Sequence, residues 1–249
     1  MNNKTLWIGI VVVLLLIGVY VIARTPNANN TSSEQENGER SSAEGRVVFS
    51  VTDAAADMEA ISEISMKISK VEMHNNVEGW VNVSSTPRTY NLLELNASGE
   101  SKVLADAKAT AGTYNQIRLV VDSISVKTKA GATKEAKLPS GEIKMNTVLV
   151  VKGGTTSSVN FDFLADKSLH VTGNGEYIFA PVVKTETKSE ANVSVNGSGT
   201  VSIGGGNVDD SNTVGMDLDG NVRIDFQVDS AQKIKLDSNG KIDIEGLLK

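Results

Sequence analysis

The chain contains no cysteine, and this absence removes several kinds of chemistry at once. Disulfide bonds, thiolate nucleophiles, zinc–thiolate sites and a lipid anchor attached to cysteine are all excluded. Histidine is almost as scarce, because only His74 and His170 occur, and a histidine-rich metal cluster is therefore excluded too. Without disulfides, a folded domain must be stabilised by its apolar core. A domain of roughly 140 residues is large enough to form such a core.

Aromatic residues are also few, at 4% of the chain, and the apolar content comes instead from Val, Ile and Leu. Together with abundant Ser and Thr, this composition favours strands over helices. The formal charge of −6 is spread along the chain without a basic stripe. Nucleic acid is therefore not an expected partner.

A long apolar segment is present at the amino terminus. Leu6 to Ala23 is an 18-residue run without a charge, and as a helix it would be about 27 Å long, close to the thickness of a bilayer core. It is longer than a signal-peptide core, and no convincing cleavage site follows it. We therefore predict a retained single-span anchor in residues 1–24, with a buried core helix and a cleaved signal peptide as the alternatives.

The rest of the chain divides into three parts. Residues 25–44 contain no Val, Ile, Leu, Met or aromatic residue, which predicts a disordered stalk. Residues 45–188 are predicted to form a domain, and residues 189–249 a more polar region of β-hairpins. Because the tail before the anchor is very short, we expect a single-pass cell-membrane protein with its carboxyl-terminal bulk outside the cytoplasm. Lys4 and Arg24 leave the positive-inside rule ambiguous.

Short alternating apolar runs separated by turns fill residues 46–184. Ile64, Met66 and Ile68 alternate strictly, and the alternation slips at Ser69-Lys70, which predicts a bulge. Pro181 predicts an edge or a bulge within the last run. The strands are expected at 46–51, 64–73, 80–83, 90–95, 114–121, 124–128, 148–151, 158–163 and 177–184, and short helices at 56–62 and 101–109. This pattern predicts an all-β fold, an antiparallel β-sandwich, behind the transmembrane helix.

Three hairpins are expected in the carboxyl-terminal region. They are Val193–Ile203 around Asn196-Gly197, Val214–Phe226 around Asp219-Gly220, and Ile234–Ile244 around Asn239-Gly240. Asn-Gly and Asp-Gly favour type I′ turns, in which both central residues have positive φ. Whether this region packs on the sandwich or folds alone is left open by the sequence.

Several stretches carry a resemblance to a known family. They are GRVVFSVTDAAADMEAI (45–61), ISMKISKVEMH (64–74), GWVNV (79–83), AGTYNQIRLVVDSISV (111–126), LPSGEIK (138–144) and FDFLADKSLHVTGNGEYIFAPVVK (161–184). In this order they resemble the family called domain of unknown function 4382, except that Ala55 stands where the family usually has proline. The resemblance implies a surface or envelope protein with a transthyretin-like or immunoglobulin-like sandwich, and it implies no activity.

Acidic residues near turns are the candidate metal ligands. Asp53 and Asp57 flank the first turn, and Asp162 and Asp166 lie near the last strands, so the four carboxylates would suit calcium if the fold brought them together. The simpler interpretation is that each Asp caps a turn. Segments 217–221 and 237–239 also resemble calcium loops, but the glycine and the closing glutamate are not where an EF-hand needs them. Hairpin turns explain them better, and no resident cofactor is expected.

A catalytic site has little support in the sequence. His170 lies near Asp166 and Ser168, but no G-x-S-x-G motif accompanies them. His170 also falls in an alternating segment that is typical of a strand. We therefore expect the protein not to be an enzyme, and a hydrolase is the weakest of the alternatives.

Two other features bear on the surface of the protein. N-x-S/T sequons begin at Asn29, Asn30, Asn82, Asn96, Asn192 and Asn196, and a further one at Asn3 would lie on the cytoplasmic side. Trp80 and Tyr177 are candidate stacking platforms for a carbohydrate.

The leading hypothesis is a non-catalytic surface module for structure or adhesion, with an envelope protein as a partner. The alternative is a module that binds carbohydrate or calcium.

Overall fold

The computed structural model describes residues 43–53, 58 and 60–224, and within them nearly all regular structure is β. The strands are β1 (Glu44–Asp53), β2 (Ile61–Asn75), β3 (Gly79–Ser84), β4 (Arg88–Asn91), β5 (Ser101–Thr110), β6 (Gly112–Thr128), β7 (Thr133–Lys137), β8 (Glu142–Val151), β9 (Thr156–Phe163), β10 (Leu169–Val171), β11 (Tyr177–Phe179), β12 (Val182–Ser189), β13 (Asn192–Val195), β14 (Thr200–Gly204), β15 (Asn207–Met216) and β16 (Val222–Ile224). Two short helices are described, α2 (Leu92–Ser98) and α3 (Ala165–Ser168). The prediction of an all-β fold is confirmed.

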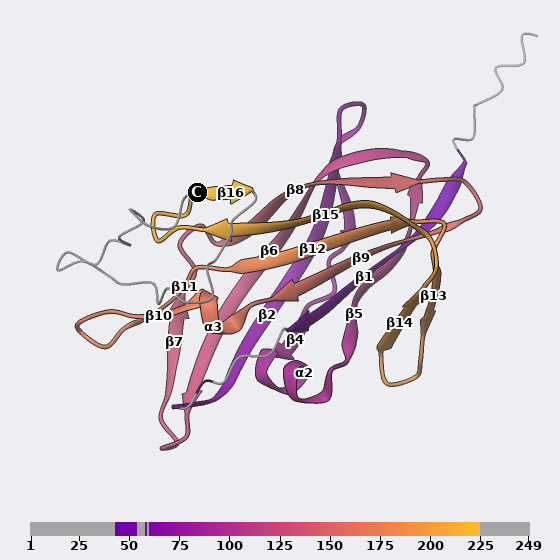
Figure 1. Ribbon diagram of the computed structural model, residues 1–249. Helices are drawn as coiled ribbons and strands as arrows, with labels where there is room; N and C mark the ends of the chain where they lie inside the picture. The colour runs from indigo at the N-terminus through magenta and orange to yellow at the C-terminus, as the bar shows by residue number, and fades with distance from the viewer. Residues whose placement is uncertain (1–42, 54–57, 59, 225–249) are drawn as a thin grey trace, which may run out of the picture. The chain divides into compact units, whose positions relative to one another are not determined.

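The strands form two eight-stranded sheets (Figure 1). Sheet A has the order β13-β14-β5-β1-β9-β12-β15-β16. Sheet B has the order β10-β11-β7-β6-β2-β3, with β4 paired to β2 and β8 paired to β6. Most neighbours are antiparallel, as expected, but β1 runs parallel to β9 and β11 runs parallel to β7. Each sheet is therefore mixed rather than purely antiparallel.

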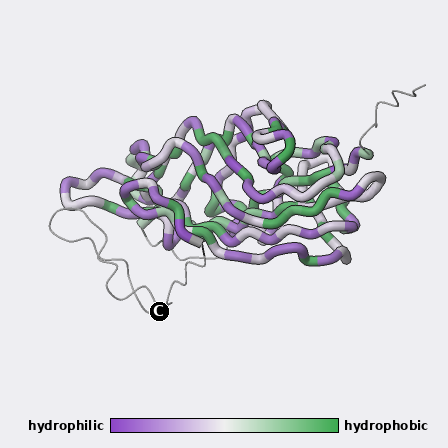
Figure 2. The backbone as a smooth tube through the Cα atoms, turned by 90° about the horizontal axis from the view of Figure 1, so that it is seen from above, coloured by the Kyte–Doolittle hydropathy of each residue, from purple (hydrophilic) through white to green (hydrophobic). Residues whose placement is uncertain are grey.

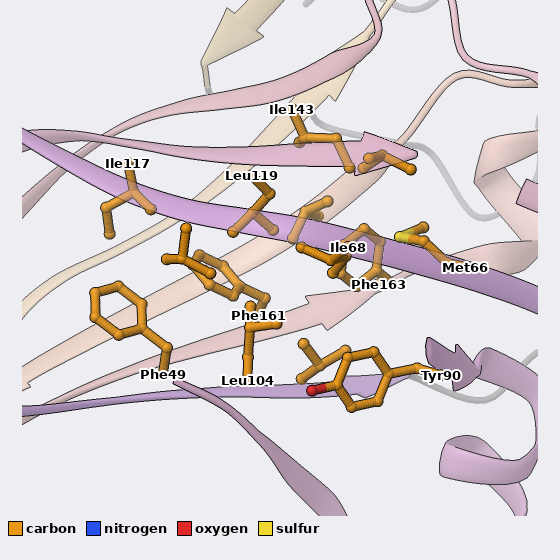
Figure 3. Packing of buried hydrophobic residues seen from close by; sticks show 14 of the residues in the cluster. Phe49, Met66, Ile68, Tyr90, Leu104, Ile117, Leu119, Ile143, Phe161 and Phe163 are labelled. Carbon is orange, nitrogen blue, oxygen red and sulfur yellow. The ribbon is translucent and has the colours of Figure 1, made fainter. Parts of the chain in front are cut away.

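The two sheets share one apolar core. Hydrophobic and hydrophilic residues alternate along the strands (Figure 2), so that each strand gives one face to the interior. Phe49, Phe161 and Phe163 point inward from sheet A, toward Ile117 and Leu119 of sheet B (Figure 3). All five side chains are fully buried. This burial of large side chains from both layers is what holds the sheets face to face.

The alternation in β2 gives a direct test of the sequence pattern. Ile64, Met66 and Ile68 are at most 1% exposed, and they lie in the common core. Ile68 is paired with Val121 and Lys70 with Val120, so Ser69 is an extra residue between two regular pairs. The predicted bulge is confirmed at this position. A second irregularity, at Asp122, interrupts the regular pairing of β6 with β2 where the sequence predicted a break between two strands.

Two secondary-structure predictions are wrong. The segment 101–109, predicted as a helix, is β5, because its pairing with β1 and the burial of Val103, Leu104 and Ala105 override the helical preference of its residues. The segment 90–95, predicted as a strand, ends as β4 at Asn91 and continues as α2. Leu92 and Leu95, three positions apart, bury one side of that helix. The other predicted helix, 56–62, lies partly outside the described residues, and its last two positions begin β2.

The last predicted strand, 177–184, is divided at Ala180-Pro181. Residues before this point form β11 of sheet B, and residues after it form β12 of sheet A. Pro181 has no N–H to give to a ladder, while its carbonyl oxygen accepts a 2.9 Å hydrogen bond from the N–H of Met216. The proline therefore marks the crossing between the sheets, and not a position inside an edge strand.

The described part of the carboxyl-terminal region belongs to sheet A. β15 pairs with β12, and β14 pairs briefly with β5. The β13–β14 hairpin also packs Val193 and Ile203 against Val48 on the outer face of the sheet, where Val103 and Val201 complete a second, smaller apolar cluster. The region thus packs on the sandwich, a question that the sequence left open.

Two of the three predicted hairpins are present, and the third lies outside the described residues. In the first, Val195 pairs with Val201, and the N–H of Asn196 donates to the carbonyl oxygen of Thr200 over 3.1 Å. Only Gly199 of this loop has a positive φ, of 76°. The same arrangement recurs at Gly220, with φ of 87°. Both loops are type I turns closed by a left-handed glycine, and not the type I′ turns that the dipeptides predicted.

Candidate functional site

Three of the four predicted acidic residues lie in one part of the structure, whereas Asp57 is outside the described residues. Asp53 ends β1 beside β9, where Thr52 is paired with Asp162. Its Oδ1 atom accepts a hydrogen bond from the N–H of Ala165 over 3.1 Å. Burial, reinforced by the charges of Asp162 and Asp166, raises the pKa of Asp53 to about 7. Among the described residues no group of three acidic or histidine side chains is placed to hold a metal ion.

The Asp166–Ser168–His170 segment connects the two sheets. The hydroxyl of Ser168 donates to the carbonyl oxygen of Leu164 over 2.7 Å and accepts from the N–H of Val182 over 2.9 Å. One of these backbone partners precedes α3 and the other begins β12. His170 lies in β10, and burial lowers its pKa to about 4. These contacts give Ser168 a structural role.

Asp217 caps the turn between β15 and β16. Its Oδ1 atom accepts hydrogen bonds from the N–H of Asp219 over 3.0 Å and from the N–H of Asn221 over 2.8 Å. A carboxylate directed at the backbone in this way is a turn cap, which agrees with the hairpin interpretation of this segment. The similar segment at 237–239 lies outside the described residues.

Trp80 lies on the outer face of sheet B among charged side chains. The guanidinium carbon of Arg118 is 4.2 Å from the centre of its ring, and the ammonium of Lys144 is 5.9 Å away. His74 meets the ring edge-on at 5.1 Å between centroids. Arg118 in turn donates two bonds, of 2.6 and 2.7 Å, to the buried carboxylate of Glu72. One face of this indole is therefore occupied by a cation–π contact.

Tyr177, the second predicted platform, is half-buried in β11. The ammonium of Lys134 lies 5.9 Å from its ring centre and donates a 3.0 Å hydrogen bond to the carbonyl oxygen of Gly175. Trp80 belongs to β3, at one end of the order of sheet B, and Tyr177 to β11, with β7, β6 and β2 between them. Since they do not share one surface, they do not form a single stacking platform.

A hollow of about 420 Å³ lies between α2 and the β13–β14 loop, and we call it the α2 hollow. Its lining comes from β4 and α2 within 88–98, from the start of β5 within 100–103, and from 198–199. In Figure 1, β5 lies between α2 on one side and β14 on the other. The volume falls within the usual range for small-molecule sites, about 300–1,000 Å³.

Hydrogen bonds fix the parts of the α2 hollow to one another. The hydroxyl of Tyr90 donates to the carbonyl oxygen of Val103 over 2.6 Å, which ties β4 to β5. The N–H of Val103 donates to the carbonyl oxygen of Gly199 over 2.8 Å, which ties β5 to the hairpin loop. Lys102 binds both Glu100 at 2.7 Å and the hydroxyl of Thr200 at 2.8 Å. The hollow is therefore pre-formed by contacts between segments far apart in the chain.

The predicted sequons differ in their surroundings. Asn82, Asn192 and Asn196 are exposed, as a glycan acceptor must be. Asn96 lies on α2 with its amide nitrogen buried and without a hydrogen-bond partner in the described structure, which argues against attachment of a glycan to the folded chain. Asn29 and Asn30 lie outside the described residues.

No helix within residues 43–53, 58 and 60–224 is long and apolar enough to cross a membrane. The predicted anchor, 6–23, and residues 25–42 of the predicted stalk lie outside these residues, whereas Glu44, the last residue of the predicted stalk, is the first residue of β1. In comparisons with known proteins, the profile described as Domain of unknown function (DUF4382) matches residues 44–181. No curated protein and no solved structure matches the chain.

Proposed function

Because the chain belongs to the DUF4382 family, whose description assigns no activity, we propose its function from its own residues: a non-catalytic, membrane-anchored module that displays a binding surface outside the cytoplasm. The apolar run at 6–23 is the proposed single-span anchor, and 25–42 the proposed stalk, since β1 begins at Glu44. Adhesion or a structural role in the envelope is the expected use. The protein needs no resident cofactor for this function.

The observation that carries the proposal is the α2 hollow. It is concave, bordered by polar and charged side chains, and held by bonds between β4, β5 and the β13–β14 loop. Such a rigid, polar concavity is suited to ligand binding, because the protein loses little conformational entropy when a ligand binds. By contrast, hydrogen bonds to the backbone hold the side chains that the sequence offered as candidate metal ligands or catalytic groups. These are Asp53, Ser168 and Asp217.

We also propose that the sandwich is of the transthyretin-like or immunoglobulin-like kind found in surface proteins. The two facing sheets and their common core support this kind of module. It suits a protein without disulfides, because the core alone supplies the stability. Superposition of a crystal structure of the protein on both fold types, compared by the order and connections of the strands, would decide between them.

The location is tested by protease treatment of intact cells that express the full chain with a different tag at each end. The carboxyl-terminal tag should be digested from outside, while the amino-terminal tag is protected until the membrane is permeabilised. A variant lacking residues 6–23 is the control, and it should not sediment with membranes. Protection of the carboxyl-terminal tag in intact cells would refute the proposed topology.

The non-catalytic half of the proposal has its own test. The purified full chain, in lipid nanodiscs, is incubated with envelope polysaccharides and peptides, and the release of reducing ends or free amines is measured. No release above that of empty nanodiscs is expected. Hydrolysis that disappears in a His170→Ala or Ser168→Ala variant would establish the hydrolase alternative instead.

Among the alternatives, binding of carbohydrate is favoured by a specific observation, the mixed lining of the α2 hollow. Binding of calcium has less support, since the described residues offer no group of three ligating side chains. Titration with calcium, followed by thermal unfolding, separates the two. A ligand at a hundred times its dissociation constant stabilises a native protein by about 2.7 kcal/mol.

A further inference from the structure

The α2 hollow has an apolar floor and a polar rim. Tyr90, Leu95 and Val103 line it while being at most 8% exposed, so they contribute its base. Thr89, Ser98 and Ser198 bring hydroxyls to its border, where all three are exposed. A ligand that fits this lining has apolar C–H surface on one side and many hydrogen-bonding groups around its edge.

The charges of the α2 hollow are balanced. Lys102 is already held by Glu100 and by Thr200, so its charge is compensated within the protein. Arg88 and Glu94 are exposed on the rim, and neither forms an ion pair with another residue of the described chain. One cation and one anion thus remain available to a ligand. A strongly anionic ligand such as a phosphate would meet no net positive charge there.

Arg88 and Glu94 offer complementary hydrogen-bonding chemistry. The guanidinium of arginine is a fixed fork of donors, and the carboxylate of glutamate is an acceptor only. A hydroxyl group both donates and accepts, so neighbouring hydroxyls are able to satisfy both side chains at once. Hydrogen bonds to ionised groups are stronger than those between neutral groups. The rim therefore recognises a polyol without requiring that the ligand be charged.

From these observations we propose that the α2 hollow is a binding site for a neutral saccharide, with its C–H face on the Tyr90–Leu95 floor and its hydroxyls on Arg88 and Glu94. This inference deepens the proposed function and rests on its binding, non-catalytic part, but it does not depend on the membrane anchor. Peptides are the competing class of ligand, and they form an arm of the test.

The test uses the full chain in nanodiscs, because alkyl-maltoside and alkyl-glucoside detergents carry saccharide headgroups that would compete. Fluorescently labelled nanodiscs are applied to an array of neutral and acidic glycans and, separately, to a peptide array. Affinities for the best glycan are then measured by calorimetry. The variants are Arg88→Ala and Glu94→Gln, both at exposed positions whose replacement leaves the core intact.

The matched controls are Lys137→Ala and Glu135→Gln, two exposed charges on β7 outside the lining of the hollow. Loss of one charge-assisted hydrogen bond should weaken binding of a neutral glycan about tenfold, while the controls stay within about twofold. No neutral glycan bound, preference for peptides or acidic glycans, or equal affinity in the hollow variants and the controls would each overturn the inference. The location and hydrolysis tests above do not depend on this result, so the two proposals fail separately.

Discussion

The side chain of Asp210 on β15 accepts a 3.1 Å hydrogen bond from the backbone N–H of Val148 on β8. These residues belong to different sheets. The same Oδ2 atom accepts from the hydroxyl of Thr147 over 2.8 Å, and the neighbouring Asp209 accepts from the N–H of Val150 over 3.2 Å. Two consecutive carboxylates thus satisfy backbone donors of β8 that no strand within residues 43–53 and 60–224 pairs, and they join sheet B to sheet A along this edge.

Asp210→Ala is expected to lower the free energy of unfolding by about 1–3 kcal/mol, because it leaves the hydroxyl of the buried Thr147 without an acceptor. Denaturant unfolding measures the change. Asp219→Ala is the matched control, since Asp219 is an exposed aspartate in the loop that follows β15, and it should change stability by less than about 0.5 kcal/mol. Equal effects of the two substitutions would contradict this role of Asp210.

Glu72 and Arg118 form an ion pair beneath Trp80, and Glu72 is only 5% exposed. Burial alone would raise the pKa of Glu72, but hydrogen bonds from Lys70 and Arg118 outweigh it, and the net pKa is lowered. Arg118→Leu should therefore destabilise the fold by about 1–3 kcal/mol, since the buried carboxylate of Glu72 loses both bonds from Arg118 and keeps the one from Lys70. The double variant Glu72→Gln/Arg118→Leu should recover part of this loss. Additive losses would show that the pair is not coupled.

Asp53 should make the protein less stable as the pH rises. Its pKa is about 7 in the folded chain against about 3.9 in an unfolded one, so the folded state keeps the proton over this interval. The favourable contribution is complete below about pH 4 and is lost as the pH approaches 7. Asp53→Asn, which keeps an acceptor for the N–H of Ala165, should remove this loss. Unfolding curves for both proteins at each pH provide the measurement, and parallel pH profiles would disprove the effect.

His170 should make the protein less stable as the pH falls, the opposite of the effect of Asp53. Its pKa of about 4 in the folded chain lies below the unfolded value of about 6.5, so the unfolded state takes up the proton first as the pH falls. Its favourable contribution is complete above about pH 6.5 and is lost toward pH 4, with a slope of at most about 1.4 kcal/mol per pH unit. His170→Gln should flatten the acid side of the stability profile. The double variant Asp53→Asn/His170→Gln should have a stability profile that is flatter toward both low and neutral pH.

Gly45 on β1 has no room for a side chain. A Cβ atom there would lie 2.5 Å from the carbonyl oxygen of Lys152 and 2.8 Å from Cγ1 of Val151. Gly45→Ala should cost about 1–3 kcal/mol through overpacking, seen as a lower melting temperature. Gly112→Ala is the control, because nothing lies within 4 Å of its Cβ position. A neutral Gly45→Ala would mean that the β8–β9 turn shifts freely.

Much of the fold could be predicted from local pattern, because a half-buried strand places alternate residues in the core. This is why Ile64, Met66 and Ile68 and the bulge at Ser69 were predicted correctly. The strand at 101–110 was missed because its residues favour helix in isolation, and only its partner β1 makes it a strand. Partner strands are not visible in a local pattern.

The candidate site was less predictable than the fold. The α2 hollow is assembled from residues 88–98, 100–103 and 198–199, and nothing in the sequence says that the loop after Asn196 returns to β5. The sequence left open whether Asp53, Asp162 and Asp166 meet, and it favoured a capping role for each. The three lie near one another, and the hydrogen bond that Asp53 accepts from the N–H of Ala165 agrees with that role. The sequence showed which single side chains are able to cap a turn or bind a ligand. The α2 hollow, in contrast, depends on the tertiary structure.

The parallel pairing of β1 with β9 governs the order in which the chain is able to fold. Ser50 on β1 bonds to Asn160 on β9, and these residues are 110 positions apart. A chain that emerges from its amino terminus must therefore keep β1 partly unpaired until more than a hundred further residues have followed. Pairings of such long range make folding slow, and the waiting edge of β1 is open to other chains meanwhile. A chaperone that acts on the newly made chain would have its substrate in this interval, with β1 as the strand to protect.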